Sequence, residues 1–292
     1  MDCGIKYNGR NMVSIVIPTL STIPKLEKYV SVLSYYRAVN EVIVVVNRSG
    51  EDFDQNTLHW RFLGKNKGFT GACNAGARIA KGEHLLFLND DCEMAEGALE
   101  TMVAFLEKNE NIVATQPIVT NMTEHGKQIE NIGFWVDTKI GKANPVTNIK
   151  DSQKILKQVQ DDTDKKGMLR QAQHDKGIYG LSGTCLLIRK NVFEKVGMWD
   201  ESFHSYLEDV DLAIRLQKGK YKVAPCLDAE VTHEHMATSG KMGLYKEMQD
   251  VKNWWRLMLK HPDVFVRLNT IFPLLVERGR NLSGLVKKAL RV

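Results

Sequence analysis

Two pairs of neighbouring acidic residues are the groups in this chain whose types and spacing suggest chemistry. Asn89-Asp90-Asp91 follow the nearly apolar run 84–88, and Glu208-Asp209 open a stretch with helical periodicity. Adjacent carboxylates repel one another, and a hard divalent cation such as Mg²⁺ or Mn²⁺, which prefers oxygen ligands, would stabilise them. The simpler alternative for the first pair is a turn in which Asp91 caps the following helix.

The second acidic pair is followed by a single histidine at a strand end. Leu212, Ala213 and Leu216 predict a helix, so the acids before them lie at its amino end, where the helix dipole favours negative charge. Capping of this kind accounts for Asp211, but two adjacent acids exceed what capping requires. His233 ends the short strand predicted at 229–233, and its position after both acidic sites makes a metal ligand as plausible as an ordinary hydrogen-bonded histidine.

The elements that must position these groups alternate between strands and helices. Apolar runs predict strands at 13–17, 41–46, 61–63, 84–88, 112–119, 129–136, 179–190, 221–225 and 229–233, and helical spacing predicts helices at 24–39, 95–108 and 191–196. Strand–helix–strand order indicates right-handed βαβ units and a mostly parallel sheet, with ligands beyond the carboxyl ends of the strands. The small-residue segment 66–77 is neither GxGxxG nor GxxxxGK[ST], so it supports neither a dinucleotide fold nor a P-loop. On its own it is equally well a tightly packed βα turn.

Composition narrows the class of protein. Hydrophobic residues make up 43% of the 292 and charged residues 26%, which is ordinary for a globular chain. The five cysteines are scattered and form no CxxC pair, which favours reduced thiols in the cytoplasm over disulfides or a zinc site. We find no signal peptide and no run approaching the ~20 apolar residues of a membrane span.

The basic charge is concentrated at the carboxyl end. Residues 252–292 contain nine Lys or Arg and two Asp or Glu, a net +7, whereas the first 251 residues sum to −2. Trp254, Trp255, Leu257 and Met258 begin an amphipathic helix, which either packs on the preceding domain or leads into a membrane-binding stripe. Beyond Pro262 the apolar stripe of Phe265, Leu268, Ile271, Phe272, Leu274 and Leu275, with a kink expected at Pro273, predicts an interfacial helix on the cytoplasmic face of an anionic membrane. Nucleic-acid binding is disfavoured because no stacking pattern accompanies the charge.

Residues 141–177 differ in amino-acid composition from the rest of the chain. They are polar and contain a repeat, LKQVQDD at 156–162 and LRQAQHD at 169–175. Two copies are too few for a solenoid. We predict an insertion, flexible or on the surface, that carries no catalytic group.

Seven segments together resemble the glycosyltransferase family 2 enzymes, particularly the rhamnosyltransferase-like branch that builds bacterial surface polysaccharides. In order they are SIVIPT (14–19), NKGFTGACNAG (66–76), LLFLNDD (85–91), GLSGTCLLIRK (180–190), GMWDESF (197–203), YLEDVDLAIRL (206–216) and AEVTH (229–233). The resemblance implies an α/β GT-A fold, with a Rossmann-like, mostly parallel central sheet flanked by helices over 13–240 and a C-terminal helical tail over 241–292. It also implies inverting transfer from a nucleoside-diphosphate-sugar donor to a glycan or lipid-linked acceptor, with Mg²⁺ or Mn²⁺.

The resemblance also assigns roles to individual residues. Asp209 matches the catalytic base beside Glu208, and Asp91 and His233 match the metal ligands. The donor side comprises Pro18, Thr19, Asn47, Asn66, Gly68, Asn74, Asn89 and Asp90, and the acceptor side Gly183, Thr184, Trp199 and Asp200. One position departs from the family pattern, because Val46 stands where many members carry a base-binding Asp before Asn47. A non-catalytic sugar-nucleotide-binding protein on the same fold is the alternative, although the presence of both Asp91 and Asp209 argues against it.

Overall fold

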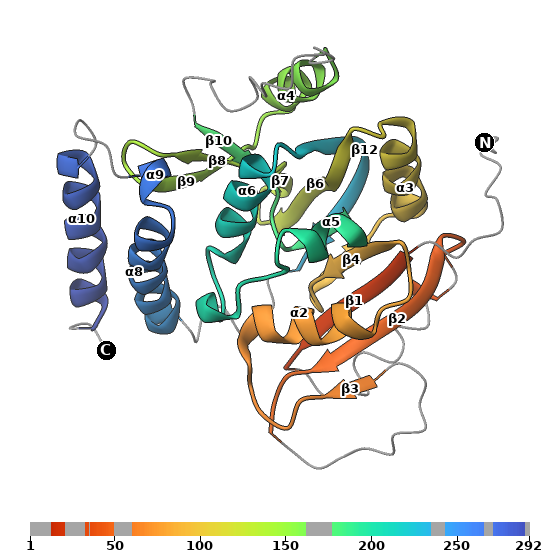
Figure 1. Ribbon diagram of the computed structural model, residues 1–292, viewed down its shortest axis with the longest axis horizontal. Coiled ribbons are helices and arrows are strands. Elements are labelled where there is room, and N and C mark those ends of the chain that lie inside the picture. Colours follow the sequence, from red (N-terminus) through yellow and green to blue (C-terminus); the bar gives the residue numbers. More distant parts are fainter. Residues whose placement is uncertain are drawn as a thin grey trace.

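The computed structural model describes residues 13–20, 33–34, 36–49, 60–161, 177–234, 243–265 and 271–289. The expected leader before residue 13, most of the predicted helix at 24–39 and the second copy of the repeat lie outside these residues. Nine strands form one sheet, in the order β3-β2-β1-β4-β11-β6-β12-β5 with β7 paired to β6 (Figure 1).

The first half of this sheet is parallel, as predicted. It consists of β1 (Val13–Thr19), β2 (Val39–Val46), β3 (Trp60–Phe62) and β4 (His84–Leu88). Every residue of β4 is buried, which explains why its sequence is apolar without alternation. All four strands therefore direct their carboxyl ends to the same edge of the sheet.

The second half mixes directions, which the sequence did not predict. β11 (Cys185–Arg189) runs antiparallel between β4 and β6 (Ile112–Thr123), and β12 (Lys222–His233) is parallel to β6. β5 (Cys92–Met94) pairs antiparallel with the end of β12, and β7 (Gly126–Asn131) pairs antiparallel with β6. The two short strands predicted at 221–225 and 229–233 are thus one strand with an irregularity in its register.

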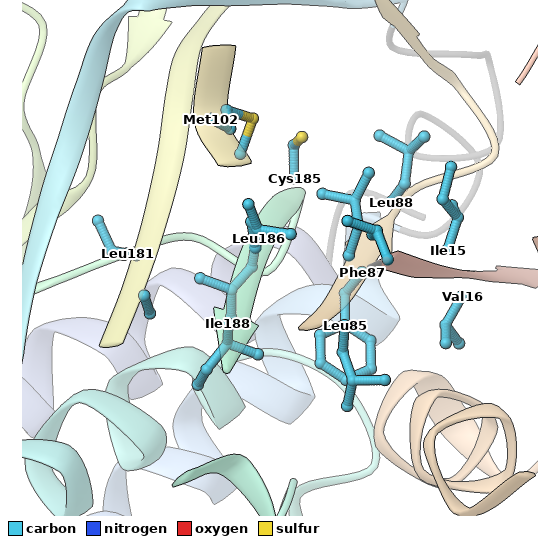
Figure 2. Close-up of a cluster of buried hydrophobic side chains, with 14 of the residues drawn as sticks. Ile15, Val16, Leu85, Phe87, Leu88, Met102, Leu181, Cys185, Leu186 and Ile188 are labelled. Atoms are coloured by element: carbon cyan, nitrogen blue, oxygen red, sulfur yellow. The ribbon is translucent and has the colours of Figure 1, made fainter. Parts of the chain in front are cut away.

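Helices cover the sheet and close the core. α2 (Gly68–Ile79) packs on β1 and β2, α3 (Ala98–Lys108) on β6 and β12, and α5 (Lys190–Lys195) follows β11. Figure 2 shows side chains of β1, β4 and β11 meeting in this core, among them Ile15, Phe87 and Leu186. A Cβ at Gly76 would lie 2.5 Å from the side chain of Val16, so α2 can lie this close to the sheet only with small residues facing it.

The segment predicted as an insertion is built into the fold. It contributes β9 (Lys142–Pro145), which joins β8 (Phe134–Asp137) and β10 (Ile178–Gly180) in a second, three-stranded sheet. It also contributes α4 (Ile149–Asp161), which packs against β12 and buries Ile155 and Val159. Of the two expected alternatives, 149–161 fits a segment on the surface: it is a helix that is exposed over most of its length and packs one apolar stripe on the core.

The carboxyl-terminal region forms α8 (Gly243–Lys260), α9 (Pro262–Phe265) and α10 (Ile271–Ala289). Trp254, Leu257 and Met258 are buried in a second hydrophobic cluster with side chains of β8 and of α6 (Glu208–Lys218), so this part packs on the catalytic domain. Phe265 and Leu274 are buried in the same cluster, which corrects their assignment to a membrane-facing stripe. Pro273 lies within the first turn of α10, a position that tolerates proline, so the kink expected there is replaced by a helix start. Among the described residues no helix has the length and hydrophobicity to cross a membrane.

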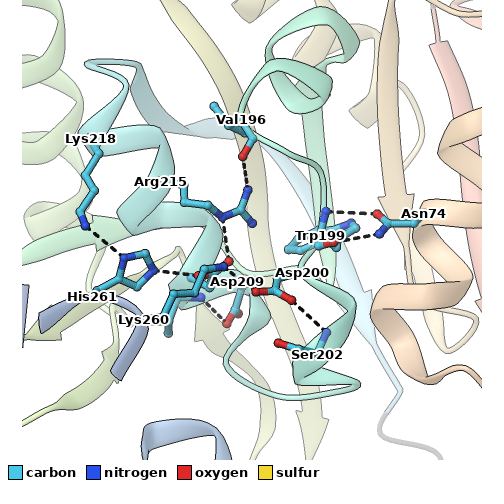
Figure 3. Close-up of polar contacts among 12 residues, drawn as sticks. Asn74, Val196, Trp199, Asp200, Ser202, Asp209, Arg215, Lys218, Lys260 and His261 are labelled. Atoms are coloured by element: carbon cyan, nitrogen blue, oxygen red, sulfur yellow. Dashed lines mark hydrogen bonds and ion pairs between the residues drawn. The ribbon is translucent and has the colours of Figure 1, made fainter. Parts of the chain in front are cut away.

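A buried network of charged side chains connects α6 to the end of α8 and to His261, which lies between α8 and α9. Asp211, fully buried, accepts from His261 Nε2 at 2.8 Å and Arg215 Nε at 2.7 Å, and its Oδ1 lies 2.7 Å from Lys260 Nζ. Burial alone would raise the pKa of Asp211, but these three partners outweigh it and lower the pKa to about 2. Figure 3 shows the surrounding contacts, including the hydrogen bond from Arg215 to the Val196 carbonyl and that between Lys218 and His261. Asp211 therefore links α6 to α8 and α9, a role beyond helix capping.

Candidate functional site

The predicted metal ligands meet at the carboxyl edge of the sheet. Antiparallel pairing of β5 with β12 sets Cys92 opposite His233, which brings the preceding Asp91 beside the histidine. Asp91 Oδ1 lies 3.2 Å from His233 Nε2. Because β5 separates Asp91 from α3, the aspartate does not cap that helix, and the simpler alternative for the acidic pair fails.

A glutamate that the sequence did not single out completes this group. Glu130, on β7, lies 3.0 Å from the other ring nitrogen of His233, Nδ1. Burial lowers the pKa of His233, but hydrogen bonds to Asp91 and Glu130 outweigh it and raise the pKa to about 9. Without a metal, the raised pKa keeps both ring nitrogens protonated, and each faces a carboxylate. A cation bound between Asp91 and His233 would replace the Nε2 proton while Nδ1 keeps donating to Glu130, which is how carboxylates orient metal-ligating histidines.

The donor atoms suit a small divalent cation. Ligand atoms of Asp91, Cys92 and His233 lie within 4.8 Å of one another. Burial holds the pKa of the Cys92 thiol well above its usual range, so the sulfur stays protonated and is a poor ligand. One carboxylate and one imidazole remain, and such a pair leaves coordination positions for phosphate oxygens.

Hydrogen bonds connect this group to neighbouring strand ends. The Thr19 hydroxyl, at the end of β1 after Pro18, donates to Asp90 at 2.5 Å. The backbone N–H of Asn89 donates to the Thr184 carbonyl at 3.0 Å, so the turn before β11 lies against the acidic loop. The backbone N–H of Gly183, in the same turn, lies near enough to Asp209 to lower the pKa of its carboxyl. The turn at 183–184 thereby bridges the two acidic sites, which are more than a hundred residues apart in sequence.

Glu208 and Asp209 begin α6, as predicted. Burial raises the pKa of Glu208, and the charge of Asp209 raises it further; Glu208 Oε2 has no hydrogen-bond partner among the described residues. Burial also raises the pKa of Asp209, although backbone N–H groups of Val210 and Gly183 oppose the rise. A carboxylate with a raised pKa is a stronger base than an exposed one, which suits proton abstraction near neutral pH.

The side-chain amide of Asn47, just after β2, holds the predicted donor loop at 66–68 through three hydrogen bonds. Asn47 Oδ1 accepts from Lys67 N at 2.7 Å, and Asn47 Nδ2 donates to the Gly68 carbonyl at 2.9 Å and to Asn66 Oδ1 at 3.2 Å. Asn47 is only 4% exposed, so its side chain positions the loop and is not free to read a nucleobase. Asn66, in contrast, is exposed at the loop.

Three other predicted residues have structural partners. Asn74 pairs through its amide with both backbone groups of Trp199, at 2.8 and 3.1 Å (Figure 3). The Trp199 ring is 1% exposed and packs edge-on against Phe69 and Phe87, so it has almost no surface through which to touch an acceptor. Asp200 accepts from Ser202 N and from Lys260 Nζ. These three residues line a cavity of about 440 Å³ between α2, the turn at 196–201, α6 and α8.

The sequence of this chain is similar to those of known glycosyltransferases. The sequence model of the family described as "Glycosyl transferase family 2" matches residues 14–197. An N-acetylglucosaminyl-diphospho-decaprenol L-rhamnosyltransferase of Mycobacterium tuberculosis is 35% identical over 91 residues, which are 27% of this chain and 30% of that protein. The low-salt glycan biosynthesis hexosyltransferase Agl10 of Haloferax volcanii is 21% identical over 94% of this chain and 81% of its own.

Solved structures share the fold. GalNAc-T7 with UDP, GalNAc and Mn²⁺ superposes with a TM-score of 0.54 at 18% identity, over 77% of this chain and 43% of that one. The mannosyltransferase PcManGT of Pyrobaculum calidifontis with GDP-Man and Mn²⁺ gives 0.54 at 13% identity, over 94% and 75%. The predicted GT-A fold is confirmed, and the chain belongs to glycosyl transferase family 2.

Proposed function

We propose that this glycosyltransferase is inverting and metal-dependent, and moves a sugar from a nucleoside-diphosphate-sugar to a glycan or lipid-linked acceptor in surface polysaccharide synthesis. One observation carries the proposal. At a single sheet edge, an Asp91–His233 pair suited to a divalent cation lies across the 183–184 turn from Asp209, a carboxylate with a raised pKa.

The chemistry follows from these positions. Asp209 accepts the proton of an acceptor hydroxyl while that oxygen bonds to the anomeric carbon and the bond to the diphosphate breaks with its electron pair. The configuration at that carbon inverts because this is one displacement. Glu208, whose pKa is also raised, is protonated more readily than an ordinary glutamate, so a single negative charge on the pair remains on Asp209. A divalent cation bound by Asp91 and His233 would neutralise charge developing on the diphosphate.

The relatives support the substrate classes. Both solved neighbours carry a nucleotide or nucleotide sugar with Mn²⁺, and the mycobacterial relative is named for a lipid-linked diphosphate acceptor. We take Mn²⁺ or Mg²⁺ as the metal and leave the sugar and the base open. With Val46 at the family's base-binding position and Asn47 occupied by the donor loop, we propose that the base is read by other groups. Asn66 is one of them: its Oδ1 accepts from Asn47 and Gly68, but the residue is exposed at the loop and offers its Nδ2 as a donor.

The test is a panel of nucleotide sugars, UDP-glucose, UDP-N-acetylglucosamine, GDP-mannose and dTDP-rhamnose, screened for binding and slow hydrolysis with Mn²⁺. We expect one donor to be consumed, and EDTA or Asp91→Ala to abolish both binding and hydrolysis. An unchanged rate in EDTA would overturn the metal assignment. Metal-dependent binding of a donor that is never hydrolysed or transferred would favour the alternative, a non-catalytic sugar-nucleotide-binding protein.

We also propose that α10 attaches the enzyme to the cytoplasmic face of an anionic membrane. Phe272, Leu275, Leu282 and Val286 are spaced by three, seven and four residues, so they lie along one side of the helix, and all are exposed, Phe272 at 76%. Exposed Arg280 and Lys287 are on the same helix, in a region with net charge +7. An apolar stripe beside basic residues suits the boundary between headgroups and acyl chains.

Vesicles containing phosphatidylserine test the attachment. Phe272→Ser with Leu282→Ser should lower co-sedimentation about tenfold, whereas Leu259→Ser, which removes a more exposed leucine from α8, should not. A truncated variant for the same assay should end at Phe265, because a shorter one that lacks His261 would also lose the ion pair between His261 and Asp211. Equal sedimentation of both variants and wild type would exclude α10 as the anchor.

A further inference from the structure

The short segment 203–207, immediately before Glu208 and Asp209, has an unusual backbone. His204, Tyr206 and Leu207 have φ angles of 63°, 71° and 66°, in the left-handed region that residues with a Cβ rarely adopt. Five such non-glycine residues occur among the described residues, and three of them lie here. Left-handed residues clustered at a functional site persist only when surrounding contacts hold them.

One of these contacts comes from the start of α2. Thr70 N donates to the His204 carbonyl at 3.2 Å, and Phe69 N donates to Ser205 Oγ at 3.2 Å. A Cβ at Gly68 would lie 2.3 Å from the His204 carbonyl oxygen, so only glycine permits this approach. The segment thus joins the predicted donor loop to the first turn of α6.

The other contact comes from α8. Asn253 is fully buried, and its Nδ2 lies within hydrogen-bond distance of three carbonyl oxygens of the segment, those of Phe203 at 3.0 Å, Ser205 at 2.9 Å and Tyr206 at 2.8 Å. Because the amide nitrogen carries two hydrogens, one of them is shared between two of these carbonyls. Its Oδ1 accepts from Arg256 at 2.6 Å, which fixes the orientation of the amide. Three carbonyl dipoles that point to one place repel one another. The amide hydrogens of Asn253 offset this repulsion by hydrogen bonding to the carbonyl oxygens.

Two further residues of α8, Tyr245 and Lys246, also contact the segment 203–207. Tyr245 Oη lies 3.0 Å from His204 Nδ1, and Lys246 Nζ lies 5.6 Å from the centre of the Tyr206 ring. Farther along α6, Asp211 is held by Lys260 and His261. The first turn of α6 is therefore attached to the carboxyl-terminal helices on both sides of Asp209.

We propose that Asn253 is a positioning residue of the active site: by gathering three carbonyls it holds the left-handed segment 203–207 and so sets where Asp209 stands. The proposal rests on the proposed function of Asp209. Asn253 lies beyond the region 14–197 that matches the family, so the assignment comes from the contacts of this chain alone. The carboxyl-terminal region then contributes to catalysis as well as to attachment.

Three variants test the proposal. Asn253→Ala removes the amide, and Asn253→Asp keeps its size and its pairing with Arg256 but turns a carboxylate toward three carbonyls. Leu257→Ala is the matched control, because Leu257 is buried on the same helix and belongs to the apolar cluster. Each is measured by thermal unfolding, by hydrogen–deuterium exchange, and by kcat and KM for whichever of the four nucleotide sugars wild type hydrolyses with Mn²⁺.

We expect both Asn253 variants to exchange faster at 203–211 with β4 unchanged, and to lose at least tenfold in kcat with the donor KM within threefold. Asn253→Asp should be the weaker enzyme. The acidic limb of the pH–rate profile should move to lower pH as Asp209 becomes exposed. Leu257→Ala should lower the melting temperature at least as much and keep kcat within threefold.

Two results would overturn the proposal. One is unchanged exchange at 203–211 in Asn253→Ala, a readout that needs no donor. The other is a loss of kcat that merely follows the loss of stability across Asn253→Ala and Leu257→Ala; if Asn253→Ala does not fold, Asn253→Asp gives the same comparison. Asp209→Asn separates the two ideas, because full turnover in that variant rejects the proposed base while the exchange data still decide the role of Asn253.

Discussion

Substitution of Asp211 by asparagine tests how firmly the carboxyl-terminal helices are part of the enzyme. Asp211 is fully buried, with His261, Arg215 and Lys260 around its carboxylate. Its pKa in the fold is about 2 against an ordinary value of 3.8. Each pKa unit corresponds to about 1.4 kcal/mol, so ionised Asp211 contributes about 2 kcal/mol at neutral pH. Removing one partner of a buried ion pair typically costs about 3–5 kcal/mol, and we therefore expect a loss of about 2–4 kcal/mol.

The pH dependence of the loss in unfolding free energy shows whether it comes from the ionised carboxylate of Asp211. Because folding lowers the pKa of Asp211, its contribution is complete above about pH 4 and is lost as pH falls through about 2. At pH 3 about 1 kcal/mol of the contribution is already gone, so the difference between wild type and Asp211→Asn should narrow by that amount from pH 7 to pH 3.

Urea unfolding, followed by circular dichroism at pH 7, 5 and 3, measures this difference. Asp263→Asn is the control, because Asp263 pairs with Lys218 on the surface, with 63% of its side chain exposed, and should change stability by no more than about 0.5 kcal/mol. Equal stability of Asp211→Asn and wild type, or a difference that is the same at all three pH values, would refute the account of the network.

Three further predictions address other parts of the molecule. Glu130→Gln should weaken Mn²⁺-dependent donor binding by about 10- to 100-fold, as substitutions behind metal-ligating histidines do, and titration calorimetry with unchanged affinity would remove Glu130 from the site. The raised pKa of Asp209 means that the base is ionised only at higher pH than an ordinary aspartate, so kcat/KM should rise with pH through that raised pKa; a rate already independent of pH at 4 would contradict it. Ile155→Ala in α4 should cost about 2–4 kcal/mol of unfolding free energy, whereas exposed Lys154→Ala should cost no more than about 0.5 kcal/mol; similar unfolding midpoints would show that α4 does not contribute to the core.

Local signals were sufficient for the strands in the first half of the fold and for the places of the two acidic pairs, at a strand end and at a helix start. The strand His84–Leu88 was predicted with its observed bounds because His84 and the four apolar residues after it end abruptly at three polar ones. The start of α6 was predicted from the spacing of Leu212, Ala213 and Leu216. In both places the sequence signal and the tertiary structure depend on the same few neighbouring residues.

The missed features depend on contacts between distant segments. Glu130 lies in the segment 129–136 that the sequence predicts as a single strand, and it reaches His233 only because β7 pairs with β6, which pairs with β12. Asn253 is one polar residue within an amphipathic helix, and only the fold brings the carbonyls of 203–206 to it. No pattern within either segment could have identified these partners.

The carboxyl-terminal stripe was misread for a related reason. Apolar residues at helical spacing are required both by a helix packed on a protein core and by one lying on a membrane. Phe265 and Leu274 turn out to be core residues, whereas Phe272 and Leu275 are exposed. The sequence alone shows one continuous stripe, and only the packing of α8 and α10 divides it in two.

The most direct test of the central claim is turnover of an accepted nucleotide sugar by Asp209→Asn beside wild type, with donor affinity measured separately. The substitution keeps the shape of the side chain and removes the base. We predict that donor affinity stays within a few-fold while kcat falls by about 10² or more, the scale of general-base catalysis. Turnover of Asp209→Asn at the wild-type rate, with donor affinity unchanged, would contradict the assignment of Asp209 as the base.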